Sequence, residues 1–329
     1  MGISLTTIAI IGAGLSGLTL AHKLKDIAEV HIYEKSRGVG GRLAARRAEP
    51  FHFDHGAQFF LAKTEEFSEF LKPLISEGVI EPWCARFVEM QNDKVVARRQ
   101  WTKEQCHFVS LPSMNGMAKF LAKGLDVRLN TEISTFKRGD KWALVDAGNI
   151  EHGPYDWVIS TAPSAQSSKL LPVDFKYHQE ISGIKMLGCY ALMLGFEASL
   201  ALDFDAAHVS QADISWISVN SSKPGRSEDY CLQVHATNRW TEDHMEDDKD
   251  AVLEHLISET SKVVGVDLNS ATHKAVHRWR YANINRLEGE LFFLDGENKL
   301  AACGDWCVEG RVEAAFTSAY ALAEALIEA

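Results

Sequence analysis

The chain has 329 residues, of which 46% are hydrophobic, and a formal net charge of -11. It can bury a large core, and it is long for one compact domain. The acidic balance argues against non-specific nucleic-acid binding, and no apolar run reaches the roughly 18 to 20 residues of a membrane span. We therefore expect a soluble two-domain enzyme that binds neither nucleic acid nor membrane.

The N-terminal apolar stretch is not typical of a signal peptide, because it lacks a basic leading region and glycines interrupt it. The six cysteines are scattered along the sequence. This usage is typical of reduced thiols and predicts a cytoplasmic protein. Cys303 and Cys307 form the single close pair in the sequence, and no other ligand cluster lies near them, so we expect no metal site.

A glycine-rich turn follows the first apolar run of the chain. The run Ile8–Ile11 is typical of a buried parallel strand, and a helix is expected from about Leu15. Gly12 allows a tight turn, Gly14 lets the backbone approach a pyrophosphate, and Gly17 lets the helix pack closely on the strand. The helix would direct its free N–H groups and the positive end of its dipole at the phosphates. The pattern predicts a dinucleotide-binding site.

An acidic residue and a second glycine stretch support this prediction. Glu34 lies 20 residues after Gly14, where a carboxylate accepts hydrogen bonds from the adenosine ribose hydroxyls. With a strand before the turn and a helix after it, an ordinary loop is the weaker interpretation. The stretch Arg37–Arg42 adds glycines and a forked cation suited to phosphate. This combination resembles the FAD-binding start of the flavin-containing amine oxidase superfamily, which favours FAD over NAD.

Short strands and helices alternate through the middle of the chain. A helix is expected over 64–75, kinked at Pro73, because acidic residues occupy its first turn and apolar residues recur on one face. Six acidic residues between Glu242 and Asp250 are interpreted as a solvated helix start rather than a metal site. The other expected elements are strands over 84–90, 95–101, 127–133, 142–145, 156–163, 190–196, 214–219 and 230–236, and helices over 113–123 and 242–264, the latter capped by Gly265.

The C-terminal segment is expected to return to the cofactor. An apolar strand over 300–305 ends in Gly-Asp, and a helix follows over 312–327. At the carboxyl end of a strand, Asp305 could hold the ribityl hydroxyls, and the N–H groups of Val312 and Glu313 could face the flavin N1/O2 edge. An ordinary aspartate before a helix is the alternative, and the pairing with the N-terminal turn favours the cofactor role.

These elements predict an α/β protein with two domains. We expect a discontinuous Rossmann-like FAD-binding domain formed by residues 1–62, 126–163 and 270–329. A second, α+β substrate domain with a mixed or antiparallel sheet is expected from residues 63–125 and 164–269.

Local motifs narrow the resemblance. The stretches Phe53–Phe60, His277–Ala282, Gly304–Cys307 and Arg311–Phe316 resemble the renalase family, a small branch of the same superfamily, and the match in order and spacing covers almost the whole chain. The resemblance implies a non-covalent FAD. It also implies oxidation of dihydropyridine isomers of NAD(P)H, reduced at ring position 2 or 6, to NAD(P)+, with O2 as acceptor and hydrogen peroxide as the second product.

The chain departs from the larger amine oxidases at one informative place. The Ser-Gly-Gly-Cys-Tyr segment that can tether the flavin in monoamine oxidases is absent, and the corresponding stretch is His277–Ala282. A covalent cysteinyl flavin is therefore not expected. We also identify no lysine equivalent to the one that contacts flavin N5 through water in those enzymes, which weakens the amine interpretation.

The implied chemistry needs positioning rather than a general base, because losing the hydride restores an aromatic cation. Our candidates for this role are His235 and Trp216 on strands of the substrate domain, with Trp279 and Arg280 near the flavin. Ordinary alternatives stay open. His235 could be a core histidine and Trp216 a core tryptophan, whereas Arg280 could meet substrate phosphates, the flavin or a nearby carboxylate.

Three functions remain open: the dihydro-NAD(P) oxidase, a small flavin-dependent amine oxidase, and a flavin-bound binding protein without turnover. The full set of expected cofactor-binding residues is Gly12, Ala13, Gly14, Leu15, Ser16, Gly17, Glu34, Lys35, Gly41, Arg42, His55, Gly56, Ala57, Gln58, Phe59, Ile133, Ala162, Pro163, Gly304, Asp305, Arg311, Val312 and Glu313.

Overall fold

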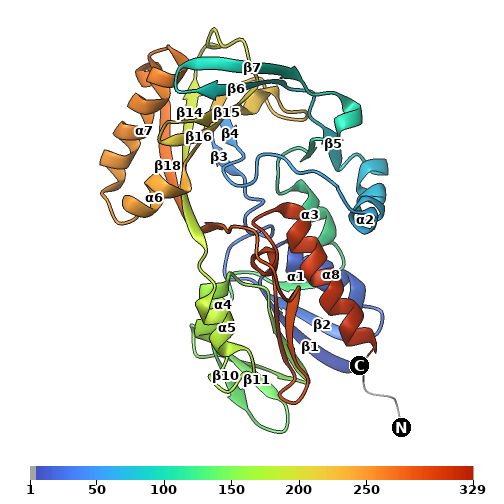
Figure 1. The fold of residues 1–329 in the computed structure, drawn as a ribbon. Coiled ribbons are helices and arrows are strands. Elements are labelled where there is room, and N and C mark those ends of the chain that lie inside the picture. The colour runs from blue at the N-terminus through green and yellow to red at the C-terminus, as the bar shows by residue number, and fades with distance from the viewer. Residues whose placement is uncertain (1–4, 329) are drawn as a thin grey trace. The chain divides into compact units, whose positions relative to one another are not determined.

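The computed structural model describes residues 5–328 and divides into two compact units (Figure 1). Unit 1 contains residues 5–42, 118–186 and 284–328, and unit 2 contains residues 43–117 and 187–283. Each unit has its own large sheet, so the protein combines a Rossmann-like α/β domain with a second domain built on a mixed sheet.

The central sheet of unit 1 is almost entirely parallel. Its order is β19-β20-β13-β1-β2-β9, and β19 alone among these strands runs antiparallel to its neighbour. The middle strands are runs of small and β-branched residues buried on both faces, as expected for a sheet covered by helices. The strands are β1 (Thr6–Ile11), β2 (Ala28–Tyr33), β9 (Asp126–Arg128), β13 (Trp157–Ser160), β19 (Phe292–Asp295) and β20 (Leu300–Cys303).

Two long helices of unit 1, α1 (Leu15–Leu24) and α8 (Val312–Glu328), pack against each other (Figure 1). They come from the first and last segments of the chain, so this packing brings the two ends of the sequence to one place. The remaining elements of unit 1 are β10 (Ile133–Arg138), β11 (Trp142–Asp146), β12 (Glu151–Tyr155), α4 (Ser164–Leu170), α5 (His178–Gly183) and η4 (Asp305–Cys307), while α3 (Gly116–Leu121) spans the boundary with unit 2.

Unit 2 is built on a seven-stranded mixed sheet of order β18-β14-β17-β16-β15-β6-β7. All neighbouring strands pair antiparallel except β15 with β6, which pair parallel. The strands are β6 (Arg86–Gln91), β7 (Lys94–Gln100), β14 (Leu187–Phe196), β15 (Ala206–Ser210), β16 (Ile214–Val219), β17 (Tyr230–Ala236) and β18 (His273–Asn283).

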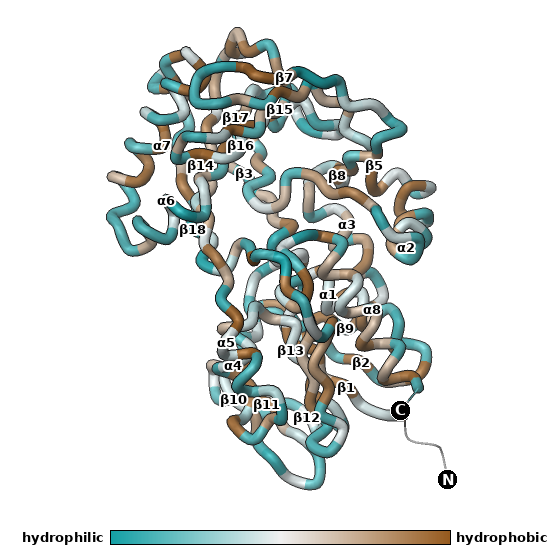
Figure 2. Tube along the Cα trace, in the orientation of Figure 1, coloured by the Kyte–Doolittle hydropathy of each residue, from teal (hydrophilic) through white to brown (hydrophobic). Residues whose placement is uncertain are grey.

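The two faces of this sheet differ in chemistry because successive side chains of a strand alternate between them. Tyr190, Leu192 and Val234 belong to an apolar core on the face that α6 (Asn238–Asp243) and α7 (Lys249–Val264) cover. The hydrophobic residues of β14 and β16 stand out in Figure 2. The opposite face carries His235 and its neighbour across the strands, Trp216.

Shorter elements complete unit 2. Helix α2 (Glu65–Ser76) contains Pro73, and the hydroxyl of Thr64 accepts a hydrogen bond from the backbone N–H of Phe67 at its start. The other elements are β3 (Arg46–Ala48), β4 (Phe51–Phe53), β5 (Ile80–Pro82), β8 (Phe108–Ser110), η1 (Lys103–Gln105), η2 (Asn220–Ser222) and η3 (Leu268–Ser270).

Two elements expected from the sequence need correction. The helix expected over 242–264 is two helices, α6 and α7, because the Asp248 carboxylate accepts hydrogen bonds from the N–H groups of Asp250 and Ala251 and starts a new helix. The cap at its other end is confirmed, since Gly265 has φ +69°. The strand expected over 127–133 is split between β9 and β10.

The expected domain boundaries also differ from the units. Residues 43–62 and 270–283 belong to unit 2 rather than to the nucleotide-binding domain. Phe51 and Phe53 pack against Met193, and β18 pairs with β14 along most of its length. Long-range pairing of this kind leaves no mark in the local sequence.

Residues 118–125 and 164–186 were expected in the substrate domain but belong to unit 1. The hydroxyls of Ser160 and Ser167 hydrogen-bond at 2.8 Å, which ties α4 to the end of β13. The His22 ring contacts the Leu121 carbonyl oxygen at 2.5 Å, which ties α3 to α1. Across residues 5–328, no helix has the length and apolar character that crossing a membrane requires.

Candidate functional site

The glycine turn of unit 1 leaves no room for side chains at two positions. Gly12 has φ +107°, and a Cβ there would lie 2.8 Å from the hydroxyl oxygen of Thr161. A Cβ at Gly17 would lie 2.0 Å from the Gly12 carbonyl oxygen. At Gly14, by contrast, none of the described residues has an atom within 4 Å of an added Cβ. The turn is thus tightly packed on the protein side and open at the position expected to face a pyrophosphate.

The N-terminus of α1 is available to an anion. Among residues 5–328, no side chain caps this helix at Gly14, so its first N–H groups keep their partial positive charge. The Ser16 hydroxyl donates a hydrogen bond of 2.8 Å to the carbonyl oxygen of Ala315. The first turns of α1 and α8 therefore lie side by side, and a shared cofactor site between these two segments remains a prediction.

Glu34 is held at the end of β2 by backbone donors. Its carboxylate is buried and accepts hydrogen bonds of 2.8 Å from the N–H groups of Ala13 and Ser36. Its own N–H donates to the Arg128 carbonyl oxygen at 2.9 Å. A carboxylate has about four lone-pair sites, so two remain for the ribose hydroxyls that we predict as its partners.

Arg42 and Asp305 form one paired group rather than two separate contacts. The guanidinium donates two parallel hydrogen bonds, of 2.7 and 2.5 Å, to the buried Asp305 carboxylate. A Cβ at Gly41 would lie 3.4 Å from the Gly14 Cα, so the second glycine stretch packs against the first. Asp305, which belongs to the C-terminal segment, therefore holds the Arg42 side chain in place. The sequence did not predict this pairing.

The other expected cofactor residues of unit 1 have different surroundings. The Ala162 carbonyl oxygen accepts a hydrogen bond of 2.9 Å from the Trp306 ring N–H, and Lys35 donates to the Gln166 side chain. Arg311 is exposed and pairs with Glu309. Roles of these residues toward FAD remain predictions, as do those of Ala13, Leu15, Ile133, Pro163, Gly304, Val312 and Glu313.

Five residues expected at the cofactor, His55–Phe59, lie in unit 2. The structure brings them together with three of the four predicted substrate residues. His55 stacks on Trp279 with ring centroids 5.2 Å apart, and the Trp279 ring N–H donates to the His55 carbonyl oxygen at 2.8 Å. Gln58 reaches His235, with 3.5 Å between their Nε2 atoms.

One row of neighbouring residues crosses four strands of the unit 2 sheet. His277 pairs with Ala191, Ala191 with His235, and His235 with Trp216. Residues directly opposite each other point to the same face. We call the surface formed by His277, Trp279, His235, Trp216 and the segment 55–59 the histidine face.

The histidines of this face are held neutral. Burial, with the positive charge of Lys223 as a second cause, lowers the pKa of His235 to about 4. Burial also lowers the pKa of His55 to about 4, and neighbouring His277 and Arg46 contribute. The pKa of His277 is lowered by burial and then by Arg46. His235 and His55 are therefore uncharged at neutral pH, and the lowered pKa of His277 favours its neutral form.

Beneath the histidine face lies a buried charged network. The Asp54 carboxylate accepts hydrogen bonds of 2.6 and 3.1 Å from the Arg226 guanidinium and one of 2.9 Å from the Met114 N–H. The Lys223 ammonium lies 3.4 Å from the same carboxylate and donates to Gln58 and Asn220 at 3.1 and 3.0 Å. Two cations thus share one carboxylate, with almost no exposure to solvent.

An aromatic cluster flanks Trp216. Its ring lies 5.5 Å from Phe59 and 6.4 Å from Trp101, and Trp101 stacks on His107 at 3.7 Å. The Trp216 ring N–H and His107 Nδ1 are buried, and no described residue hydrogen-bonds to either.

The fourth predicted substrate residue, Arg280, is not part of this group. It lies on β18 one residue after Trp279, which turns it to the helix-covered face, where it forms an ion pair of 2.6 Å with Glu246. The sequence left three partners open for this arginine: substrate phosphates, the flavin or a nearby carboxylate. In the structure its partner is a carboxylate, that of Glu246.

Sequence reasoning missed the residues of the charged network and most of the aromatic cluster. Asp54 is far in the sequence from Lys223 and Arg226. The three side chains are buried together because the fold brings Asp54 against the segment that follows β16. A weak signal existed in the sequence at Asp54, which stands between Phe53 and His55 in one of the stretches that resemble renalases.

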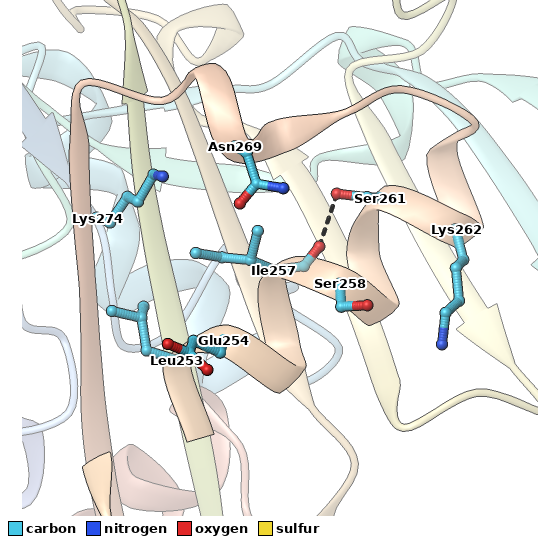
Figure 3. A pocket seen from close by; sticks show the side chains of 8 residues that line it. All are labelled: Leu253, Glu254, Ile257, Ser258, Ser261, Lys262, Asn269 and Lys274. Carbon is cyan, nitrogen blue, oxygen red and sulfur yellow. Dashed lines mark hydrogen bonds between the residues drawn. The ribbon is translucent and has the colours of Figure 1, made fainter. Parts of the chain in front are cut away.

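A separate pocket of about 550 Å³ lies on the helix-covered side of the unit 2 sheet (Figure 3). Its lining comes from α7, η3 and β18, with Lys274 and Asn269 facing α7. None of the predicted site residues lines it. Across the described part of the chain, no group of three or more histidine, cysteine or acidic side chains could hold a metal ion.

Two family models match the sequence. The model of an NAD(P)-binding Rossmann-like domain matches residues 10–74, and that of the flavin containing amine oxidoreductases matches residues 84–327. The chain belongs to the flavin-containing amine oxidoreductases. Its cofactor is FAD. Three features of unit 1 fit FAD: the space at Gly14, the N-terminus of α1 without a capping side chain among the described residues, and the Glu34 carboxylate held by backbone donors.

Several solved structures have the same fold. A candidate protoporphyrinogen oxidase from Exiguobacterium sp. 255-15 matches with a TM-score of 0.80 and 13% identity over 100% of both chains. A triple mutant of putrescine oxidase matches with a TM-score of 0.73 and 13% identity, over 98% of this chain and 99% of the other. Wild-type putrescine oxidase bound to putrescine matches with a TM-score of 0.66 and 13% identity, over 99% of each chain. At this identity the likeness concerns the fold.

Proposed function

We propose that this flavin-containing oxidoreductase is a renalase-like oxidase that removes hydride from dihydropyridine isomers of NAD(P)H reduced at ring position 2 or 6. The observation that carries this proposal is the excess of positive charge at the histidine face. Lys223 and Arg226 share the single carboxylate of Asp54, and Arg46 adds a further cation that acts on His55 and His277.

This charge balance favours an anionic substrate over a cationic one. An alkyl amine is protonated at neutral pH, so it would approach a surface whose nearby charges repel it. A dinucleotide carries negative phosphates, which the same charges attract. Asp54, the carboxylate beneath this face, is already bonded to Arg226 and is poorly placed to receive an ammonium group.

The residues of the histidine face suit the positioning of a flat ring. Bound FAD supplies the hydride acceptor. His235 and Trp216 would orient the dihydropyridine, and the His55–Trp279 stack would close the face against water. No protein group has to remove a proton, because the donor carbon loses a hydride and the product is the aromatic pyridinium of NAD(P)+.

The overall reaction balances with oxygen as the acceptor. One dihydro-NAD(P), one proton and one O2 give one NAD(P)+ and one hydrogen peroxide. All six cysteines are free thiols, which is compatible with the reducing conditions of a cytoplasmic site of action.

The experiment is a turnover assay with product analysis. Purified 2- and 6-dihydro isomers of NAD and NADP, ordinary 4-dihydro-NADH and putrescine are each incubated with the enzyme in air. We expect NAD(P)+ and peroxide in equal amounts from at least one isomer, and slow or no turnover of the other compounds. Aldehyde and peroxide from putrescine, with no turnover of any isomer, would support an amine oxidase instead. Ligand binding without product from any compound would indicate a binding protein.

A further inference from the structure

Arg46 lies beside the histidine face. In the hairpin of β3 and β4, Arg46 is directly opposite Phe53, and residues paired in this way point to the same face. The Phe53 ring stacks on the His273 ring, with the centroids 5.3 Å apart. His273 precedes His277 by four residues on β18, so both rings point to the same side of that strand. Arg46 is therefore next to the side of β18 that contributes to the histidine face.

The positive charge of Arg46 acts on three imidazoles of this region. It contributes, after burial, to the lowered pKa of His273 and of His277. For His55, burial and then His277 contribute more to the lowered pKa, and Arg46 follows. The His55 and His277 rings are themselves 4.9 Å apart. These effects agree with the place of Arg46 in the β3–β4 hairpin.

Arg46 differs from the other cations near the histidine face because it is exposed and unpaired. Lys223 and Arg226 are buried and bonded to Asp54, so they act on a ligand through their charge alone. Arg46 is exposed, and across residues 5–328 its side chain has neither an ion-pair partner nor a hydrogen-bond acceptor. It therefore keeps its five N–H donors for an anion. Other arginines of unit 2 each pair with a carboxylate, namely Arg86, Arg98, Arg99, Arg278 and Arg280.

We propose that Arg46 binds a phosphate group of the dinucleotide substrate. This inference rests on the proposed function, because it names the residue that holds the substrate away from its reacting ring. One ribose separates the pyridine ring of a dinucleotide from the nearest phosphate, so a phosphate-binding cation has to lie beside the ring site and not within it. Arg46 has such a place next to His273, and its planar guanidinium can donate two parallel hydrogen bonds to phosphate oxygens.

A contact at this distance from the reacting carbon contributes to binding and not to the chemical step. The phosphate keeps its charge while the hydride leaves, so Arg46 stabilises the bound substrate and the transition state equally. Loss of such a contact raises KM and leaves kcat unchanged. Arg46 would thus select phosphorylated dihydropyridines over the neutral nucleoside.

The test compares holoenzymes on substrates with and without phosphate. The oxidised isomer is supplied as the dinucleotide and as the corresponding dihydronicotinamide riboside. In Arg46→Ala, KM for the dinucleotide should rise at least about 10-fold, while kcat and the kinetics of the riboside stay the same. Arg46→Lys keeps the charge without the planar fork and should give an intermediate KM. An equal rise for the riboside would show a merely structural role and overturn the proposal.

Arg47→Ala is the matched control. Arg47 is also exposed, and as the next residue of β3 it points to the opposite face of the hairpin, so its loss should leave KM unchanged. The NAD and NADP forms of the substrate locate the phosphate. A rise in KM for both forms in Arg46→Ala indicates the pyrophosphate, and a rise for the NADP form alone indicates the 2′-phosphate.

Two binding measurements separate this proposal from the proposed function. An unchanged KM for the dinucleotide in Arg46→Ala overturns the phosphate contact, while turnover of the isomer retains the function. If the wild type oxidises no isomer, calorimetric titration with NAD+ and NADP+ decides: weaker binding by Arg46→Ala retains the Arg46 site without the function, and equal or absent binding removes both. Titration of the apoproteins with FAD should give equal affinities, and a weaker affinity in Arg46→Ala would assign Arg46 to the cofactor and overturn the proposal.

Discussion

The cofactor site of unit 1 and the histidine face of unit 2 are built from different parts of the chain. In unit 1 the predicted FAD site is shaped mainly by backbone: a turn that a Cβ would block at Gly17, helix N–H groups, and a glutamate held by two backbone donors. Its side-chain part is the Arg42–Asp305 pair. The histidine face of unit 2 is instead made of side chains on four strands and one loop, supported by the Asp54 network. A site shaped by backbone has a few positions at which almost no substitution is tolerated. In a site made of side chains, each residue depends instead on several partner side chains.

The largest effect is expected in the charged network of unit 2. Arg226→Met leaves Asp54 with the more distant Lys223 and two carbonyl oxygens without their donor, so we expect about 3 kcal/mol of lost stability. Lys223→Met leaves the Asp54–Arg226 pair intact and should cost much less. Chemical denaturation of both holoenzymes measures the difference, and an equal loss in the two variants would contradict the division of roles within the network.

The next effect tests the backbone character of the unit 1 site. Gly17→Ala places a Cβ 2.0 Å from the Gly12 carbonyl oxygen, so helix and turn must separate. FAD affinity should fall at least about 100-fold, which corresponds to about 2.8 kcal/mol. Gly183→Ala is the matched control, since no described atom lies within 4 Å of a Cβ there. Titration of the apoproteins with FAD decides, and normal affinity in Gly17→Ala would show that the turn is not the binding site.

Glu34 provides a smaller test of the same site. Glu34→Ala removes the predicted acceptor for two ribose hydroxyls, and lost hydrogen bonds to a charged group cost about 1.5 to 3 kcal/mol. FAD affinity should weaken by one to two orders of magnitude, roughly. Glu29→Ala, at an exposed carboxylate of β2, serves as the control. Unchanged affinity in folded Glu34→Ala would remove this residue from the site.

These two regions also differ in how far the sequence predicted them. The glycine turn, Glu34 and both flanking strands were predicted, because their signals lie within 34 consecutive residues. His235, Trp216 and Trp279 were named as candidates from the resemblance and from strand patterns. The Lys223–Gln58–His235 contacts and the Arg42–Asp305 pair were not predicted, since they join residues that only the fold brings together. For Arg280 the sequence left substrate phosphates, the flavin and a nearby carboxylate open, and the structure pairs it with Glu246.

The smallest expected effect concerns pH. His55 and His235 have pKa values lowered to about 4, so both stay neutral when the pH falls from 7 to 5, whereas an ordinary histidine with a pKa near 6.5 would become charged. The rate of flavin reduction at saturating substrate should change less than about two-fold over this interval. A rate that titrates near pH 6.5 would mean that one of these rings gains a proton during the reaction.

The most direct test of the central claim is anaerobic stopped-flow mixing of the oxidised holoenzyme with single substrates. We predict rapid bleaching of the flavin absorbance by the 2- or 6-dihydro isomers of NAD(P), with one NAD(P)+ formed per flavin, and little bleaching by primary amines or by 4-dihydro-NADH. His235→Ala should slow the step by about 10- to 100-fold without abolishing it. Rapid bleaching by a primary amine, with none by the dihydro isomers, would contradict the account and make the protein an amine oxidase.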